Sequence, residues 1–213
     1  MSQLADRLRL ETKSSHHRAE RTGVMPLLLA GKADRATYFL LIRNLLPVYQ
    51  ALERALRSVA QDPVISGGIY PELWREPALV ADLEVLGGPS WSDTAPLPEA
   101  LRYAARIEAA VERPVLLLAH AYVRYLGDLS GGQVLKRLVR SQLGLEGEDG
   151  TSFYDFPAVA DIDAFKTKYR ETLNRLPLSS ADQDAVIAEA IEAFRLNMDL
   201  FDAVPSAAPR PPS

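Results

Sequence analysis

The stretch Tyr122-Val-Arg-Tyr-Leu-Gly-Asp-Leu-Ser-Gly-Gly-Gln133 is the most unusual part of the 213-residue sequence. It places three glycines, Gly127, Gly131 and Gly132, inside a pattern that otherwise predicts one helix from Pro114 to Gly144. A glycine in a helix interior costs about 1 kcal/mol relative to alanine. Three of them in one helix therefore indicate a requirement for bare backbone.

Gly127 and Gly131 are four residues apart and lie one above the other on a single face of this helix. A face without side chains lets a large flat ligand approach the backbone closely. Close packing against another helix, or a kink, explains the same spacing. Arg124 and Asp128 share this side of the helix. They form either a surface ion pair or a pair that orders water above a bound ligand.

Helical periodicity dominates the rest of the chain, and no segment shows the sustained alternation of a half-buried strand. We therefore predict an all-α fold with one domain, residues 1–204, and a disordered Pro- and Ala-rich tail, residues 205–213. The other helices are expected at Leu4–Arg21, at Pro26–Ala30, from an Asp34 cap to Ser58, within Tyr70–Val85, from Pro98, at Asp161–Leu176 and from Ser180. Ser180 and Gln183 are expected to form a capping box.

Composition excludes several classes of protein. Lys and Arg number 24 against 28 Asp and Glu, and this balance argues against a general nucleic-acid-binding protein. The absence of cysteine excludes disulfides, thiolate metal sites and cysteine nucleophiles, and it suits a reducing cytoplasm. Charges interrupt the first ten residues, and the most apolar run, Val115–Val123, is too short to cross a bilayer. We expect a soluble cytoplasmic protein without membrane or nucleic-acid partners.

The sequence contains three histidines, His16, His17 and His120. None has the Glu-x-x-His spacing of a four-helix di-iron site, so a single imidazole ligand to a cofactor is the remaining metal chemistry. His16 has Glu20 one turn later and Lys13 and Arg9 at earlier turns of about the same face. A lone helix histidine is also commonly exposed or hydrogen-bonded within a core, so both interpretations stay open.

Lys166 and Arg170 form a second basic pair, four residues apart. Alone, this pair indicates a solvated helix face. Together with Arg9 and Lys13, it gives four cations on two predicted helices, which is enough to bind two carboxylates of an anionic ligand.

These residues resemble those of the heme oxygenase family. The stretch Ala119-His-Ala-Tyr-Val-Arg-Tyr-Leu-Gly-Asp-Leu-Ser-Gly-Gly-Gln133 is similar to the family signature almost residue for residue. Further matches are Thr12-Lys13, His16, Ala19-Glu20, Val48-Tyr49, Ala51-Leu52-Glu53, Phe165-Lys166, Tyr169-Arg170, Phe194 and Leu196-Asn197. The resemblance implies an all-helical fold that holds heme between a proximal helix and a glycine-rich, kinked distal helix.

By this resemblance, His16 is the proximal iron ligand and Glu20 is the carboxylate near its other ring nitrogen. Gly127, Gly131 and Gly132 let the distal helix lie over the porphyrin. The residues that match the apolar sides of the pocket are Met25 and Phe194, and those that match the propionate contacts are Arg9, Lys13, Tyr122, Lys166 and Arg170. Asp128 matches the catalytic aspartate, and the residues of the surrounding water network are Tyr49, Tyr103, Arg124 and Asn197.

The resemblance further implies an enzyme for which heme b, with its bound iron, is both cofactor and substrate, and O2 is the co-substrate. The products are biliverdin, carbon monoxide and ferrous iron, and the matching propionate cations imply opening at the alpha position. The chain shows no hydrophobic carboxyl-terminal anchor and no transit peptide, which implies a soluble bacterial-type enzyme. Its implied partners are a ferredoxin or flavodoxin with its reductase, and a biliverdin acceptor such as a phytochrome.

Two alternatives stay open at the level of sequence. A heme carrier or sensor would keep His16 and the cations but has no use for a carboxylate at Asp128. A helical interaction protein whose glycines only permit close packing would bind no heme.

Overall fold

A computed structural model of the chain describes residues 3–145 and 149–208. Helices joined by short turns make up this described part, and it contains no strand. Its α-helices are α1 (Leu4–Glu11), α2 (Lys13–Ala19), α3 (Val24–Leu29), α4 (Arg35–Ser58), α5 (Glu76–Gly87), α6 (Pro98–Ala109), α7 (Leu117–Ala121), α8 (Gly127–Leu143), α9 (Ile162–Arg175) and α10 (Ser180–Ala207). The predicted all-α fold class is confirmed.

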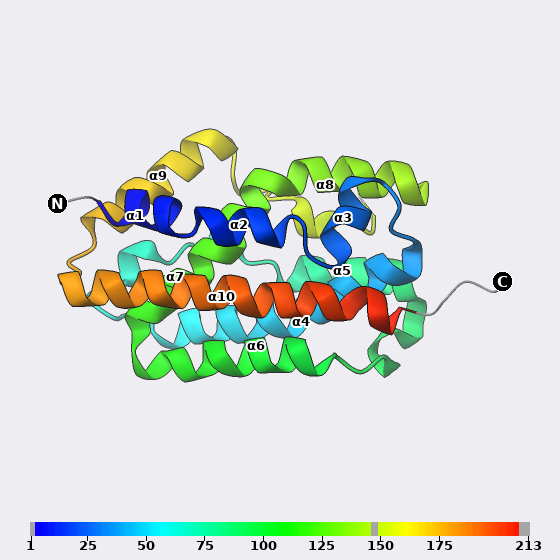
Figure 1. The fold of residues 1–213 in the computed structure, drawn as a ribbon. Coiled ribbons are helices and arrows are strands. Elements are labelled where there is room, and N and C mark those ends of the chain that lie inside the picture. The colour runs from blue at the N-terminus through cyan, green and yellow to red at the C-terminus, as the bar shows by residue number, and fades with distance from the viewer. Residues whose placement is uncertain (1–2, 146–148, 209–213) are drawn as a thin grey trace.

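The last helix, α10, runs along most of the length of the molecule and packs against α2, α6 and α7 (Figure 1). The second long helix, α4, packs on α5 and α6, while α8 contacts α3 and α9 contacts α1. Buried apolar side chains from these helices form one continuous cluster from Leu4 to Val204. Within residues 3–145 and 149–208, none of the helices combines the length and the apolar character that crossing a bilayer requires.

The helix predicted from Pro114 to Gly144 is interrupted. After α7, a π-helical turn occupies Tyr122–Leu126, and α8 begins at Gly127. Turns of this kind are rare in proteins, and those that occur often lie at functional sites. The predicted stop is confirmed, because Gly144 caps α8 with φ 61° and ψ 34°, a left-handed conformation that costs glycine no Cβ clash. The interruption falls directly before the glycine face.

The helix predicted over Leu4–Arg21 is two helices. Thr12 separates α1 from α2, and its hydroxyl donates a hydrogen bond to the Leu8 carbonyl at 2.7 Å. A threonine that bonds back to the carbonyl four residues earlier often bends a helix, which explains the break. The Asp34 cap is confirmed, since its carboxylate accepts the Thr37 N–H at 2.8 Å.

The helix α10 begins at Ser180 as predicted, but its capping residue and its carboxyl end differ from the expectation. Ser179, rather than Ser180, is the cap: its backbone is extended and its hydroxyl accepts the Asp182 N–H at 3.1 Å. The predicted capping box of Ser180 and Gln183 is therefore wrong by one residue.

The helix also continues to Ala207, so the tail predicted to be disordered from residue 205 begins as helix. Pro205 lies within this last part of the helix. Proline disfavours a helix interior because it lacks an N–H group, but the Ala208 N–H still donates to the Val204 carbonyl at 3.1 Å. Residues 209–213 of that tail lie outside the described residues.

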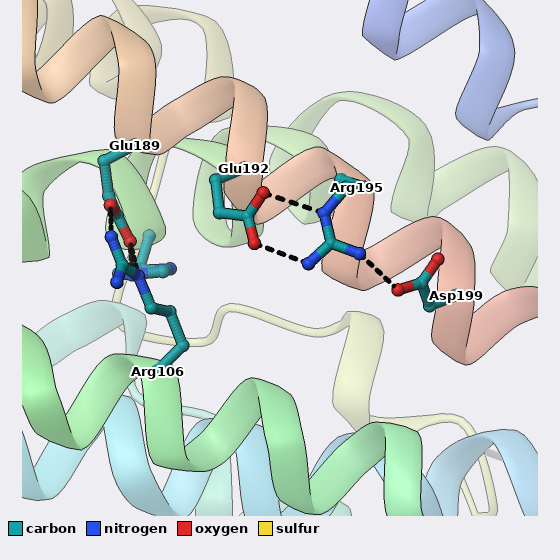
Figure 2. A network of polar contacts seen from close by, with 6 residues as sticks. Arg106, Glu189, Glu192, Arg195 and Asp199 are labelled. Carbon is teal, nitrogen blue, oxygen red and sulfur yellow. Dashed lines mark hydrogen bonds and ion pairs between the residues drawn. The ribbon is translucent and has the colours of Figure 1, made fainter.

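Ion pairs tie α10 to α6 and extend along the surface of α10. Glu189 accepts two hydrogen bonds from the Arg106 guanidinium of α6, one of them at 2.8 Å (Figure 2). Farther along, Arg195 donates to Glu192 at 2.6 and 2.8 Å and to Asp199 at 2.7 Å. The Glu189 side chain is 4% exposed, whereas that of Arg195 is 53% exposed. Arg106 is itself 47% exposed, but the pair with the buried Glu189 carboxylate should still contribute more to stability than the pairs of Arg195.

We expect Glu189→Gln to lower the free energy of unfolding by about 2–3 kcal/mol at pH 7. Glu189 also lies 2.9 Å from Nε2 of the buried His120. Burial raises the pKa of Glu189, but hydrogen bonds from His120 and Arg106 outweigh burial and hold the pKa at about 2, below the ordinary 4.5. This stabilisation is fully present above about pH 4.5 and is lost as the pH falls towards 2.

Denaturant titrations of wild type and Glu189→Gln between pH 7 and pH 2 measure this effect. The difference in unfolding free energy between the two proteins should become smaller as the pH falls below 4.5, the ordinary pKa of a glutamate. Glu192→Gln, the same change on the same helix at a more exposed position, should cost less than about 1 kcal/mol. Equal unfolding free energies of wild type and Glu189→Gln at pH 7 would contradict the expectation.

Candidate active site

A cleft with two adjoining lobes is lined by residues of α2, α8 and α10. The outer lobe has a volume of about 620 Å³ and the inner lobe about 430 Å³. The residues that line both lobes are His16, Val123, Gly127, Ser130 and Phe194, so the lobes adjoin each other. Cations border the outer lobe and mainly apolar side chains border the inner lobe. The cleft therefore suits a ligand with one charged edge and one apolar edge.

The glycine face of α8 forms part of this cleft. A Cβ atom at Gly127 or Gly131 would meet no atom within 4 Å, so both residues present bare backbone to open space. Gly132 differs, because its Cβ would lie 3.0 Å from the Tyr154 ring. Gly132 is thus a packing residue, and the structure brings two of the three predicted glycines to the cleft.

His16 of α2 is the histidine that lines both lobes. Its Nδ1 lies 3.7 Å from Glu20 Oε1, and half of the side chain is exposed. A carboxylate near one ring nitrogen orients an imidazole and leaves the other nitrogen for a ligand. His17 lines the outer lobe only, and His120 is fully buried on α7. His16 is therefore the candidate for a cofactor ligand.

Three of the four predicted cations border the outer lobe, each from a different helix: Arg9 from α1, Lys13 from α2 and Arg170 from α9. Tyr122 lines the same lobe, where burial raises its pKa while the charges of Arg170 and Arg9 oppose the rise. Lys166 does not line either lobe. Its ammonium pairs with Asp163, one turn earlier on α9, at 2.7 Å. The structure therefore places Lys166 outside both lobes, and its contact with a propionate stays a prediction.

A buried polar network lies beside the glycine face. Arg124 donates from Nε to the Tyr49 hydroxyl at 3.0 Å and from Nη1 to Asn197 Oδ1 at 2.7 Å. Asp128 accepts at both carboxylate oxygens, from Arg124 Nη2 at 3.3 Å and from the Tyr49 hydroxyl. The Arg124 and Asp128 side chains are 7% and 9% exposed, which rules out a surface ion pair. Arg124, Asp128 and Asn197 line the inner lobe, and Tyr49 lies buried behind them.

Burial raises the pKa of Asp128 above its ordinary value, although the charge of Arg124 and the hydrogen bond from Tyr49 oppose the rise. Burial also raises the pKa of Tyr49 well above its ordinary value, so its hydroxyl stays a hydrogen-bond donor at neutral pH. A carboxyl group with a raised pKa at the surface of a cleft is suited to accept and release a proton.

Tyr103 lies outside the hydrogen bonds of this network. Its ring packs 5.7 Å from the His120 ring, centroid to centroid, and its buried hydroxyl has no hydrogen-bond partner among the described residues. The structure therefore joins Tyr49, Arg124 and Asn197 to Asp128 by direct hydrogen bonds, whereas a place for Tyr103 in a surrounding water network stays a prediction.

Most apolar lining of the inner lobe was not predicted from the sequence. These residues include Leu28, Leu41, Leu45, Val123, Leu135, Phe153, Tyr154 and Phe201. Their spacing indicates burial but not the surface against which they are buried. The two predicted apolar residues, Met25 and Phe194, do line the inner lobe.

The cleft specifies its ligand by shape and charge. Open space beside Gly127 and Gly131 accepts a flat ring, His16 offers an imidazole, and three cations at the outer lobe offer contacts for carboxylates. An iron porphyrin has a flat ring, an iron atom that can bind an imidazole and two propionate carboxylates. The residues present therefore fit heme. The fold and the cleft together define an all-helical protein whose cleft fits heme and is lined by a buried carboxylate, that of Asp128.

Known proteins agree with this class. The family profile described as heme oxygenase matches residues 2–203. Heme oxygenase 1 of Nostoc sp. (strain PCC 7120) is 39% identical over 202 residues, which is 94% of this chain and 85% of that protein. Heme oxygenase of Porphyra purpurea is 41% identical over 209 residues, 97% of this chain and 89% of that protein.

Solved structures give the same result. Heme oxygenase-1 of the cyanobacterium Synechocystis sp. PCC6803, in complex with heme, matches with a TM-score of 0.92 at 36% identity, covering 96% of this chain and 93% of that one. The chain belongs to the heme oxygenase family. The predicted family and the prediction that the protein is an enzyme are confirmed.

Proposed function

We propose that this enzyme opens heme to biliverdin IX-alpha and releases carbon monoxide and ferrous iron, with O2 as co-substrate. The observation that carries the proposal is the buried carboxylate of Asp128 beside the open face of Gly127 and Gly131, in a space that His16 also lines. Two solved relatives from Synechocystis support heme as the ligand, one in complex with heme and one in complex with heme and NO.

Binding of heme is assigned to residues of the cleft. His16 is the iron ligand, and Glu20 orients its ring through the contact at Nδ1. The propionates are bound at the outer lobe by Arg9, Lys13, Tyr122 and Arg170. Met25 and Phe194 contact the apolar edge of the ring.

Bound heme supplies both the iron that activates O2 and the carbon that is oxidised. The role of the protein is to manage protons and access. The Asp128 carboxylate holds a water molecule and passes a proton into the inner lobe, while the Tyr49 hydroxyl and Arg124 fix the orientation of that carboxylate. The bare backbone of Gly127 and Gly131 bounds the space above the ring closely, which favours oxidation at one edge.

Electrons come, in this proposal, from a ferredoxin or flavodoxin with its reductase, and a phytochrome-type acceptor takes the biliverdin. These two partners rest on the sequence resemblance alone.

Product analysis tests the proposed reaction. Purified protein supplied with hemin, ferredoxin, its reductase and NADPH should produce the alpha isomer of biliverdin by chromatography, together with carbon monoxide. Another isomer would overturn the alpha assignment and keep the enzyme. Tight heme binding without any product would favour a carrier or sensor, and a protein without heme affinity would contradict the whole assignment.

Gly131→Ala should stabilise the heme-free protein by about 0.5–1 kcal/mol and weaken heme binding by about tenfold or more. Alanine is the better helix former, and its methyl group would meet no atom within 4 Å in the heme-free cleft. That methyl group occupies the space assigned to the ring. Denaturation of the heme-free protein and hemin titration followed at the Soret band measure the two effects.

Gly132→Ala is the matched control on the same helix. Its methyl group would press at 3.0 Å on Tyr154, which lines the inner lobe, so it should destabilise the fold without itself occupying the space assigned to the ring. Unchanged heme affinity in Gly131→Ala would contradict the placement of the ring.

A further inference from the structure

Phe153 and Tyr154 form a wall of the inner lobe that no sequence motif marks. They belong to a short 3-10 turn, Ser152–Tyr154, between α8 and α9. Both side chains are buried and line the inner lobe. The Phe153 ring packs edge-on against the Tyr49 ring, with centroids 5.4 Å apart, and the Tyr49 hydroxyl donates to Asp128. The wall therefore touches the network that holds the catalytic carboxylate.

Asp82 of α5 holds the end of this wall that carries Phe153. Its Oδ1 accepts the Ser152 N–H at 2.8 Å, and its Oδ2 accepts the Phe153 N–H at 2.8 Å. Asp82 is fully buried, and burial of a carboxylate is costly unless it is hydrogen-bonded. Burial raises the pKa of Asp82 to about 6, although the two backbone hydrogen bonds oppose the rise. The two backbone N–H groups of the wall offset the free-energy cost of burying the Asp82 carboxylate.

Other side chains hold the opposite end of the wall. The Tyr154 carbonyl accepts a hydrogen bond from Gln133 Nε2 at 2.8 Å. The Asp155 carboxylate pairs with the Lys136 ammonium at 2.6 Å, and the Asp155 carbonyl accepts a hydrogen bond from Arg75. Loss of the Asp82 contacts would therefore release the Phe153 end while the Tyr154 end stays attached. This division makes Asp82 a specific determinant of the Phe153 position.

We propose that Asp82 is a positioning residue for the catalytic network. By holding the Phe153 backbone, Asp82 sets the Phe153 ring against Tyr49, and Tyr49 in turn orients the Asp128 carboxylate. Asp82 does not line either lobe, so it acts on turnover through these contacts. The inference rests on the proposed function, in which Asp128 handles the proton. Turnover depends on Asp82, whereas heme binding through His16 and the outer-lobe cations does not.

Asp82→Asn tests this inference. Asparagine has the same shape but offers one acceptor oxygen instead of two, so one of the two backbone N–H groups loses its partner. In the heme-free variant, amide hydrogen exchange at Ser152 or Phe153 should be about tenfold faster or more, with exchange in α4 unchanged. With heme, kcat should fall about tenfold while the heme Kd stays within about twofold of wild type. Glu84→Gln, an exposed acid-to-amide change on α5, is the matched control and should alter none of these values.

The split between kcat and Kd separates positioning from a general structural role. Faster exchange with unchanged kcat would overturn the inference, and so would equal losses of kcat and heme affinity. Should Asp82→Asn fail to fold, Phe153→Leu tests the same link by removing the ring edge at Tyr49. Phe153 itself lines the inner lobe, so in this variant the fold-loss in kcat should exceed the fold-loss in heme affinity. If wild type itself forms no biliverdin, the proposed function fails and this inference fails with it. If wild type turns over and Asp82→Asn equals it, the inference alone fails.

Discussion

Asp128→Asn is expected to leave heme bound and to slow biliverdin formation by about 100-fold or more. Asparagine keeps the shape of the side chain and an acceptor for Tyr49 or Arg124, but it cannot take up and release a proton. A positioned proton-transfer group contributes about 10²–10⁴-fold to a rate, which sets the size of the effect. The heme contacts proposed for His16 and the outer-lobe cations do not involve Asp128, so the heme affinity should stay within a few-fold of wild type.

Hemin titration and single-turnover kinetics measure affinity and rate separately in this variant. Asp199→Asn on α10 is the matched control, because Asp199 lies on the surface, bonded to Arg195, and lines neither lobe. Its turnover should equal that of wild type. A turnover rate of Asp128→Asn equal to that of wild type would exclude the proton-transfer role proposed for Asp128.

His16→Ala is expected to abolish the spectrum of histidine-ligated heme and to reduce turnover by about 100-fold or more. The cations Arg9, Lys13 and Arg170 and the apolar inner lobe remain, so some heme uptake should persist. Imidazole added to the variant should restore part of the spectrum by entering the space that the truncated side chain leaves.

His17→Ala is the matched control for His16→Ala, because it removes the neighbouring imidazole, which lines the outer lobe only. Its heme spectrum should match that of wild type. If His17→Ala lost the histidine-ligated spectrum and His16→Ala kept it, the ligand assignment would move by one residue.

The side of the cleft formed by the glycine face and Asp128 could largely be predicted from the sequence, because the residues that form it are close together in the chain. Arg124, Gly127, Asp128 and Gly131 lie within eight residues, and helical spacing alone places them on one side of a helix. Helix type and the cap at Asp34 were predictable for the same reason, since both depend on local sequence.

Features that depend on tertiary contacts could not be predicted in this way. The family resemblance groups Gly132 with Gly127 and Gly131, but Tyr154, from a distant segment, fills the space beside Gly132. Lys166 matches a cation position, but in the structure it pairs with Asp163 and lines neither lobe. Asp82 lies 70 residues from Ser152 in the chain, and only the packing of α5 against residues 152–154 brings them together. The π-helical turn at Tyr122–Leu126 also has no distinct local signal that the helical pattern would reveal.

The most direct test of the proposed reaction is a single turnover of the purified protein loaded with hemin. Ascorbate is added in air, with catalase present to remove free peroxide, and the absorption spectrum is followed. The geometry of His16, Asp128 and the glycine face predicts that the Soret band declines and the absorption of biliverdin appears in its place. A Soret band that forms on heme binding and then persists without biliverdin would contradict ring opening and leave a heme-binding protein without turnover.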